Sequence, residues 1–390
     1  MIKFIIGKAG TGKTYSTIKS VLTQNTINVL CLAFTHSAVN NMKNYVQTLK
    51  KSKRHFNQKF TFMTLHKFFH LPIPFKPINK IPNLISDDNK PFTHIIIDEF
   101  SLIPLDIMKY ILNSMKNSIS QNQPEIPVIF IGDLLQLPPI ADIEDKSFNF
   151  QFFRKNTEIW NKIDRNLEVG YYLSNTIFTL PEYQKSDKMI LTHNYRSNDK
   201  IMKILNNIFH SISPNQPKIP ISDISMLFNL EYSDDIIIIA SEYKLLTEAL
   251  NKMKNYKGIY PTKIGFVKSN KCILNETISS DFLNGDIVFQ TQIMNDNEIE
   301  ITNLSLNQKI IVHPNRLLPY NFITVHKSQG RGYDNVILIL DDLFEITMLY
   351  TAITRAKKSI KFINFHKLHK IQNINEFNLL ENVIYYHNSI

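Results

Sequence analysis

The segment that follows the short apolar run Ile2–Ile6 constrains the fold more than any other part of the chain. Its sequence, Gly7–Thr14 (GKAGTGKT), places four residues between Gly7 and Gly12, which are followed by a lysine and a threonine. Residues Thr14–Leu22 have helical apolar spacing, so the segment is predicted to join a strand to a helix. Glycines in such a turn let successive N–H groups point at phosphate oxygens near the positive end of the helix. The pattern therefore predicts an α/β fold whose first loop binds nucleotide phosphates.

The side chains at the end of this loop have distinct expected roles. Lys13 is expected to contact the β and γ phosphates of ATP, and the Thr14 hydroxyl to bind Mg²⁺. The chain has only 10 glycines, whereas the usual frequency of about 7% would give roughly 27 in this length. Glycine is therefore kept mainly where the backbone turns tightly or approaches a ligand. The predicted nucleotide contacts are Gly7, Ala9, Gly10, Thr11, Gly12, Lys13 and Thr14.

A second part of the site is predicted where an apolar run ends in two carboxylates. Ile95–Ile97 reads as a buried strand, and Asp98 and Glu99 follow it directly. Ligands bind at the carboxyl ends of strands in such sheets. Asp98 is expected to hold the Mg²⁺ shell together with Thr14, and Glu99 to orient and deprotonate the attacking water.

Alternating apolar runs and helical stretches predict two α/β domains in tandem. The first is expected over residues 1–185 and the second over 186–390. Residues Asp286–Val312 alternate polar and apolar types without helical period, which predicts short antiparallel strands in a small inserted barrel at about 270–318. Residues Leu71–Pro91 contain five prolines and are expected to form an ordered excursion or a flexible loop from the first domain.

Further segments make the chain resemble a superfamily 1 helicase, in particular the branch that contains RecD, Dda and the Pif helicases. They occur in that family's order and extend over most of the chain. The matching segments are Thr35–Ala38, Thr64–Phe69, Phe130–Pro139, Leu191–Ser197, Phe322–Gly330 and Tyr350–Ala356.

The resemblance implies two RecA-like motor domains that use ATP and Mg²⁺ to move along nucleic acid. It implies that Gln136 senses the γ phosphate or the water, and that Arg196 and Arg355 act as arginine fingers from the second domain. Planar guanidinium groups suit the charge of a transferring phosphoryl group. It also makes residues 71–91 a candidate for a wedge that splits the duplex, with a structural loop as the alternative. The implied nucleic-acid contacts are Thr35, His36, Thr64, His66, Thr324 and His326.

The expected activity is that of an ATP-dependent 5′-to-3′ DNA helicase in replication, repair or recombination. The formal net charge of +10 agrees with single-stranded and tailed duplex DNA as partners. A superfamily 1 RNA helicase of the viral type, and a non-catalytic accessory protein, are the alternatives. Only six residues precede Gly7, so the adenine-reading segment of the family is missing and the preference for ATP rests on the resemblance.

The two cysteines are too few for a disulfide framework or a zinc site. No apolar run approaches the roughly 20 residues that span a bilayer, and the start lacks a signal-peptide pattern. A soluble, intracellular protein without a membrane partner is therefore expected.

Overall fold

The structure is a computed structural model of the chain. It describes residues 2–23, 28–52, 58–72, 84–85, 90–120, 126–137, 139, 177, 180–209, 221–222, 236–242, 244–246, 271–274, 276–279, 281–282, 286–295, 297–303, 307–340 and 346–364. Most of the predicted wedge at 71–91 lies outside these residues. None of the described helices combines the length and the apolar character needed to span a membrane.

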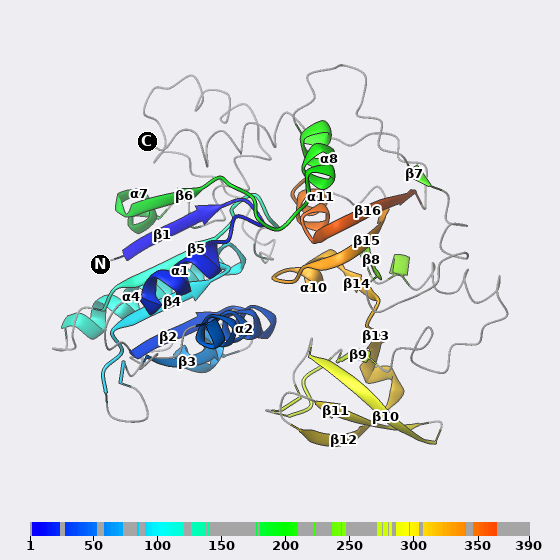
Figure 1. Cartoon of the computed structure of the whole chain (residues 1–390). Coiled ribbons are helices and arrows are strands. Elements are labelled where there is room, and N and C mark those ends of the chain that lie inside the picture. Colours follow the sequence, from blue (N-terminus) through cyan, green and yellow to red (C-terminus); the bar gives the residue numbers. More distant parts are fainter. Residues whose placement is uncertain are drawn as a thin grey trace. The chain divides into compact units, whose positions relative to one another are not determined.

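The chain divides into two compact units between Arg196 and Ser197 (Figure 1). The boundary expected from the sequence, at residue 185, lies eleven residues earlier. The difference arises because the strand over Asp187–Leu191 joins the sheet of the first unit, where it pairs with the strand that leads into Gly7. Arg196, which was expected in the second domain, therefore belongs to the first unit.

The first unit is built on a six-stranded sheet in the order β3-β2-β4-β5-β1-β6. Every neighbouring pair is parallel, as predicted, so all carboxyl ends lie along one edge. The strands are β1 (Ile2–Gly7), β2 (Asn28–Ala33), β3 (Lys59–Thr64), β4 (His94–Asp98), β5 (Val128–Gly132) and β6 (Asp187–Leu191).

Helices of the first unit follow these strands. They are α1 (Lys13–Leu22), α2 (His36–Ser52), α3 (Leu65–Phe69), η1 (Phe100–Leu102), α4 (Leu105–Ser120) and α7 (Pro181–Lys185). The apolar sides of α1 and α2 pack on the sheet in one core cluster, with residues such as Ile18, Met42, Val29 and Ile96 buried together. Full burial of such a side chain contributes about 1.5–3 kcal/mol, so the two helices fix the loops that precede them.

A separate group of aromatic rings surrounds Phe4 of β1. Phe4 stacks on Phe130 of β5 at 4.9 Å between ring centroids, and Tyr183 of α7 meets Phe4 edge-on at the same distance. Phe100, the first residue of η1, also meets Phe4 edge-on, at 5.5 Å. This aromatic cluster ties η1, which begins directly after Asp98 and Glu99, to the middle of the sheet.

The second unit also contains a parallel sheet, in the order β14-β8-β15-β16-β7. Its strands are β7 (Ile221–Ser222), β8 (Ile236–Ala240), β14 (Phe322–Thr324), β15 (Tyr333–Leu340) and β16 (Ala356–Asn364). Its helices are α8 (Asp199–Phe209), α10 (Val325–Ser328) and α11 (Ile346–Ile353). The expectation of two α/β sheets in tandem is thus confirmed.

Between β8 and β14 the chain forms an antiparallel sheet in the order β12-β11-β10-β9-β13. Its strands are β9 (Lys271–Leu274), β10 (Ile287–Asn295), β11 (Glu298–Asn303), β12 (Gln308–Val312) and β13 (Leu317–Pro319), with a short 3-10 turn η5 (Pro314–Arg316) before the last. The strands occupy the predicted interval. Among the described residues the edge strands β12 and β13 do not pair, so a closed barrel is not confirmed.

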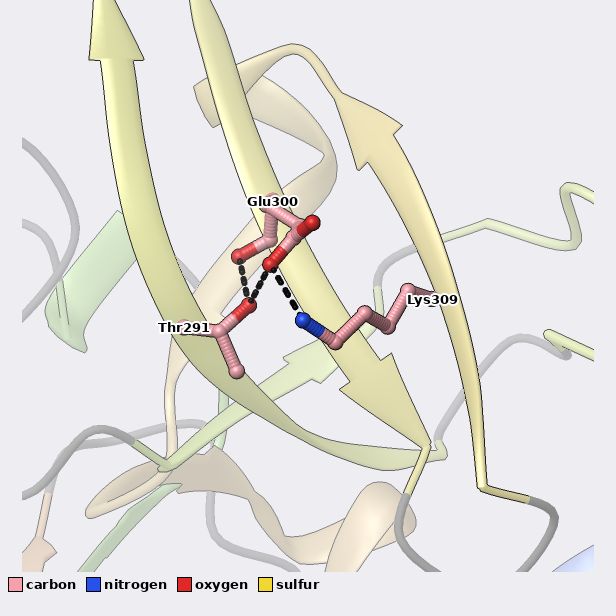
Figure 2. A network of polar contacts seen from close by, with 3 residues as sticks. All are labelled: Thr291, Glu300 and Lys309. Carbon is pink, nitrogen blue, oxygen red and sulfur yellow. Dashed lines mark hydrogen bonds and ion pairs between the residues drawn. The ribbon is translucent and has the colours of Figure 1, made fainter.

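One side of this antiparallel sheet is held by polar contacts across three strands (Figure 2). The Thr291 hydroxyl of β10 donates to a Glu300 carboxylate oxygen of β11 at 2.6 Å, and Lys309 Nζ of β12 donates to the same oxygen at 3.0 Å. The hydrogen bonds and the positive charge of Lys309 lower the pKa of Glu300. Residues such as Val288, Ile299 and Ile301 belong to its buried core cluster, which accounts for the alternation seen in the sequence.

Candidate nucleotide and nucleic-acid sites

The phosphate loop leaves β1 at Gly7 and enters α1 at Lys13, as predicted. Gly10 and Gly12 have φ angles of 83° and 74°, a left-handed conformation that other residues adopt at a cost. A Cβ on Gly7 would lie 2.6 Å from the Thr11 hydroxyl, so this position has no room for a side chain. The glycine pattern is therefore explained by backbone geometry and by space.

Lys13 turns its ammonium group back into the loop. Nζ donates to the Gly7 carbonyl at 2.6 Å and to the Lys8 carbonyl at 3.0 Å. Desolvation lowers the pKa of Lys13, while the carboxylates of Asp133, Glu99 and Asp98 act in the opposite direction. The charged lysine therefore lies among three acidic groups at the carboxyl edge of the sheet.

Thr14 and Asp98 meet as the sequence predicts. The Thr14 hydroxyl lies 2.9 Å from Asp98 Oδ2 and 3.1 Å from Oδ1, and the Glu99 N–H donates to Oδ1 at 2.9 Å. Burial, together with the negative charge of Glu99, raises the pKa of Asp98 to about 7. A hydroxyl oxygen beside a buried carboxylate is a donor set that suits a hard divalent cation.

Glu99 combines an unusual backbone with an unsatisfied side chain. Its φ of 52° and ψ of 46° are left-handed, a conformation that costs a non-glycine residue about 1–3 kcal/mol. Its Oε2 atom is buried without a hydrogen-bond partner among the described residues. Such a carboxylate oxygen retains its capacity to accept a hydrogen bond from a water molecule at this site.

The loop after β5 supplies Gln136 and a residue that sequence reasoning missed. Asp133 is completely buried, and its Oδ2 accepts from Gln136 Nε2 at 3.2 Å. Its Oδ1 accepts from the Leu135 N–H at 3.1 Å, which fixes the turn. The charge of Asp133 also acts on Lys13. Its place directly after Gly132 at the end of a buried strand was the signal in the sequence.

Arg196 lies at the phosphate loop, although it was expected to come from the second domain. Its Cβ lies 2.9 Å from the position that a Cβ on Gly10 would occupy, and its charge acts on Lys13. Asn194, which was not among the predicted site residues, donates from Nδ2 to the Ala9 carbonyl at 2.9 Å. The first unit therefore brings together Lys13, Thr14, Asp98, Glu99, Gln136 and Arg196.

Arg355 has a different environment in the second unit. Its side chain is buried, with 1% of its surface exposed. Nε donates to the Thr351 carbonyl, one terminal nitrogen to the Arg331 carbonyl and the other to the Thr354 hydroxyl, at 3.0, 3.1 and 3.2 Å. In this structure the guanidinium group thus stabilises the turn between α11 and β16, and its role as an arginine finger stays a prediction.

The three threonines predicted to contact nucleic acid all cap helices. The hydroxyls of Thr35, Thr64 and Thr324 accept from the N–H groups three residues ahead, at 3.2, 3.3 and 3.4 Å. Each threonine follows or ends a parallel strand at its carboxyl end. A capping hydroxyl accepts one bond and keeps its own proton to donate, so capping leaves room for a phosphate contact.

The histidines lie beside these caps. His36 begins α2, and the ring of His66 lies 5.1 Å from that of Phe34, which brings the segments after β2 and β3 together. Partial burial lowers the pKa of His66. His326 lies in α10 of the second unit, with an exposed side chain.

Two family models match the chain in the order expected for a motor. An AAA domain matches residues 1–142, and a UvrD-like helicase C-terminal domain matches residues 321–361. The RecBCD enzyme subunit RecD of Buchnera aphidicola subsp. Schizaphis graminum is 26% identical over 92% of this chain and 69% of its own length.

Solved structures share the fold over nearly the whole chain. Pif1 helicase from Bacteroides, in complex with ADP-AlF3 and ssDNA, has a TM-score of 0.62 at 19% identity and covers 99% of this chain and 94% of its own. Pif1 helicase from Candida albicans has a TM-score of 0.56 at 16% identity, with 97% and 95% covered. The two family models, the similarity to RecD and this shared fold agree with the motif order, and the chain is similar to superfamily 1 helicases of the RecD/Pif-like group.

Proposed function

We propose that the protein is an ATP-dependent DNA helicase that moves 5′ to 3′ along single-stranded DNA and unwinds tailed duplexes in replication, repair or recombination. The observation that carries the proposal is the meeting of Lys13, Asp98 and an unpartnered carboxylate oxygen of Glu99 at one sheet edge. A protein that binds nucleotides without hydrolysing them has no need for the unpartnered carboxylate oxygen of Glu99. The similarity to RecD and Pif1 supports the proposed 5′-to-3′ polarity.

The residues of the first unit have complementary roles in this proposal. The phosphate loop and Lys13 bind the phosphates of ATP, and Thr14 and Asp98 hold Mg²⁺, which neutralises phosphate charge when it is bound. Glu99 orients the attacking water and accepts its proton. Gln136, placed by Asp133, senses the γ phosphate.

Two arginines supply positive charge to the transferring phosphoryl group. Arg196 lies beside the phosphate loop, because its Cβ is 2.9 Å from the position that a Cβ on Gly10 would occupy and its charge acts on Lys13. Arg355 has to exchange its three hydrogen bonds before it acts as a finger. We infer that Arg355 acts only in a different arrangement of its turn, while Arg196 is available from the outset.

The nucleic-acid contacts proposed are the capping threonines and the histidines after them: Thr35, His36, Thr64, His66, Thr324 and His326. The hydroxyls lie on rigid strand ends, which suits repeated gripping of a backbone. The wedge at 71–91 and closure of the sheet at about 270–318 into a barrel remain proposals, whereas the limit between the domains moves from residue 185 to residue 196.

The ATPase is tested by hydrolysis with and without single-stranded DNA. We expect DNA to raise the rate strongly, and Lys13→Ala to abolish it because the phosphates lose their ammonium contact. Lys19→Ala is the matched control, since Lys19 is exposed on the same helix. Hydrolysis that does not respond to DNA refutes a motor.

Polarity and substrate are tested with duplexes that carry a single-stranded tail. A 5′ tail should support unwinding and a 3′ tail should not, and the opposite preference refutes the proposed direction. The same duplexes with RNA tails test the alternative RNA helicase, because the 2′-hydroxyl distinguishes the two backbones. Nucleotide binding without any unwinding favours the accessory-protein alternative.

A further inference from the structure

Asn194 connects two parts of the nucleotide site that lie far apart in the sequence. Its Nδ2 atom donates to the Ala9 carbonyl at 2.9 Å, and its Oδ1 atom accepts from the Arg196 N–H at 2.9 Å. The neighbouring Tyr195 N–H donates to the Gly10 carbonyl at 2.8 Å. One short segment after β6 therefore binds two successive carbonyls of the phosphate loop.

These two carbonyls determine where the loop's N–H groups point. A peptide bond is planar and trans, so its C=O and N–H point in opposite directions. Fixing the Ala9 carbonyl fixes the N–H of Gly10, and fixing the Gly10 carbonyl fixes the N–H of Thr11. The segment at 194–195 thus holds two peptide planes from the side opposite to their N–H groups.

The contact is closely packed as well as hydrogen-bonded. A Cβ on Gly10 would lie 2.7 Å from Nδ2 and 2.8 Å from Oδ1 of Asn194. The amide group of Asn194 therefore occupies the space that a side chain on Gly10 would need. Its left-handed φ of 83° adds a second reason for glycine there.

We propose that Asn194 is a positioning residue that sets the phosphate loop in its binding conformation and holds the backbone of Arg196 against it. Binding of phosphates by the loop then favours one placement of the Arg196 backbone, because the Asn194 side chain contacts both the loop and Arg196. The loop half of this proposal requires only that a nucleotide binds. The Arg196 half rests on the proposed ATPase function.

A purely structural role makes a different prediction, and the chain offers a matched control. Asn198 has the same pair of contacts in the second unit, since its Nδ2 donates to the Lys358 carbonyl at 2.7 Å and its Oδ1 accepts from the Ile201 N–H at 3.1 Å. Asn198→Ala removes equivalent bonds away from the phosphate loop. Any general loss of stability should appear in both variants.

The test measures ADP binding and DNA-stimulated ATPase in the full chain. Asn194→Ala should weaken ADP binding about tenfold, the effect of losing roughly one hydrogen bond, and should also lower kcat at saturating ATP. Asn198→Ala should leave both at the wild-type values. Equal losses in the two variants, or wild-type ADP affinity in Asn194→Ala, overturn the proposal.

Asn194→Asp separates the two contacts, because it keeps an acceptor for Arg196 and removes the donor to Ala9. It should weaken ADP binding while it lowers kcat less than Asn194→Ala does. Measurement at about 0.05 and about 0.5 M salt isolates the effect of the added charge, which salt screens. If the wild type binds ADP but does not hydrolyse ATP, the proposed function fails and the ADP comparison still decides the loop half.

Discussion

Replacement of Gly132 by alanine tests how the Glu99 carboxylate is kept in position. Gly132 ends β5, and an added Cβ would lie 2.8 Å from two ring carbons of Phe100 and 3.2 Å from a third. Ordinary contacts begin at about 3.4 Å, so the ring has to move by several tenths of an ångström. Phe100 is 1% exposed and is packed against Phe4 and Phe130, which leaves it little room.

The displacement should reach Glu99, because Glu99 directly precedes Phe100 and has a left-handed backbone. Overpacking of this kind costs about 1–3 kcal/mol of folding free energy. A shift of a catalytic group by about 1 Å can cost about 100-fold in rate. We therefore expect Gly132→Ala to lower the urea midpoint and to reduce kcat by about tenfold or more, with little change in the KM for ATP.

A second substitution distinguishes this route from general damage. Phe100→Leu removes the ring that the new methyl group meets, so the double variant should recover part of both the stability and kcat lost in Gly132→Ala. Contacting residues typically show coupling of about 0.5–3 kcal/mol. Additive losses in the double variant, or a raised KM with unchanged kcat in Gly132→Ala, refute the reasoning.

Other residues offer simpler tests. Glu99→Gln should abolish hydrolysis while ADP binding, followed by fluorescence titration, stays near the wild-type value. Arg355→Lys should lower the free energy of unfolding by about 2–3 kcal/mol, because a lysine cannot replace three guanidinium hydrogen bonds; an unchanged urea midpoint would show that these bonds do not form. Thr64→Ala should lower the free energy of unfolding by about 1 kcal/mol, because the α3 cap is lost. Thr64→Ser keeps the capping hydroxyl, so it should change the urea midpoint little. Burial lowers the pKa of His66 below its usual 6.5, so its contribution to stability is complete above that pH and declines as the pH falls below it. His66→Gln should reduce the loss of stability between about pH 7 and about pH 5.5, and an identical loss in both proteins contradicts this.

Local sequence pattern predicted the parts of the fold that depend on local physics. The apolar run before Asp98 is a buried strand, and the Asp98 carboxylate at its end meets the Thr14 hydroxyl as predicted. The glycine spacing predicted the phosphate loop because left-handed φ angles and lack of space are properties of single positions. These features need no knowledge of distant parts of the chain.

Features set by long-range pairing were less accessible. The strand β6 is partly exposed and not continuously apolar, and its pairing with β1 decides that Arg196 lies in the first unit. Alternation over Asp286–Val312 indicated antiparallel strands, but whether two edges close into a barrel depends on contacts between the ends of the segment. The link from Asn194 to the phosphate loop spans 185 residues and leaves no local pattern.

The position of β6 has a consequence for how the first unit can be made. During synthesis β1 emerges first, yet one of its two edges stays without a partner until residues 187–191 follow. An uncovered edge of a parallel sheet offers free N–H and C=O groups to any other extended chain. A fragment that ends at residue 142, where the AAA domain match ends, would keep that edge open. The shortest fragment with both neighbours of β1 extends to Leu191, and shorter ones should self-associate.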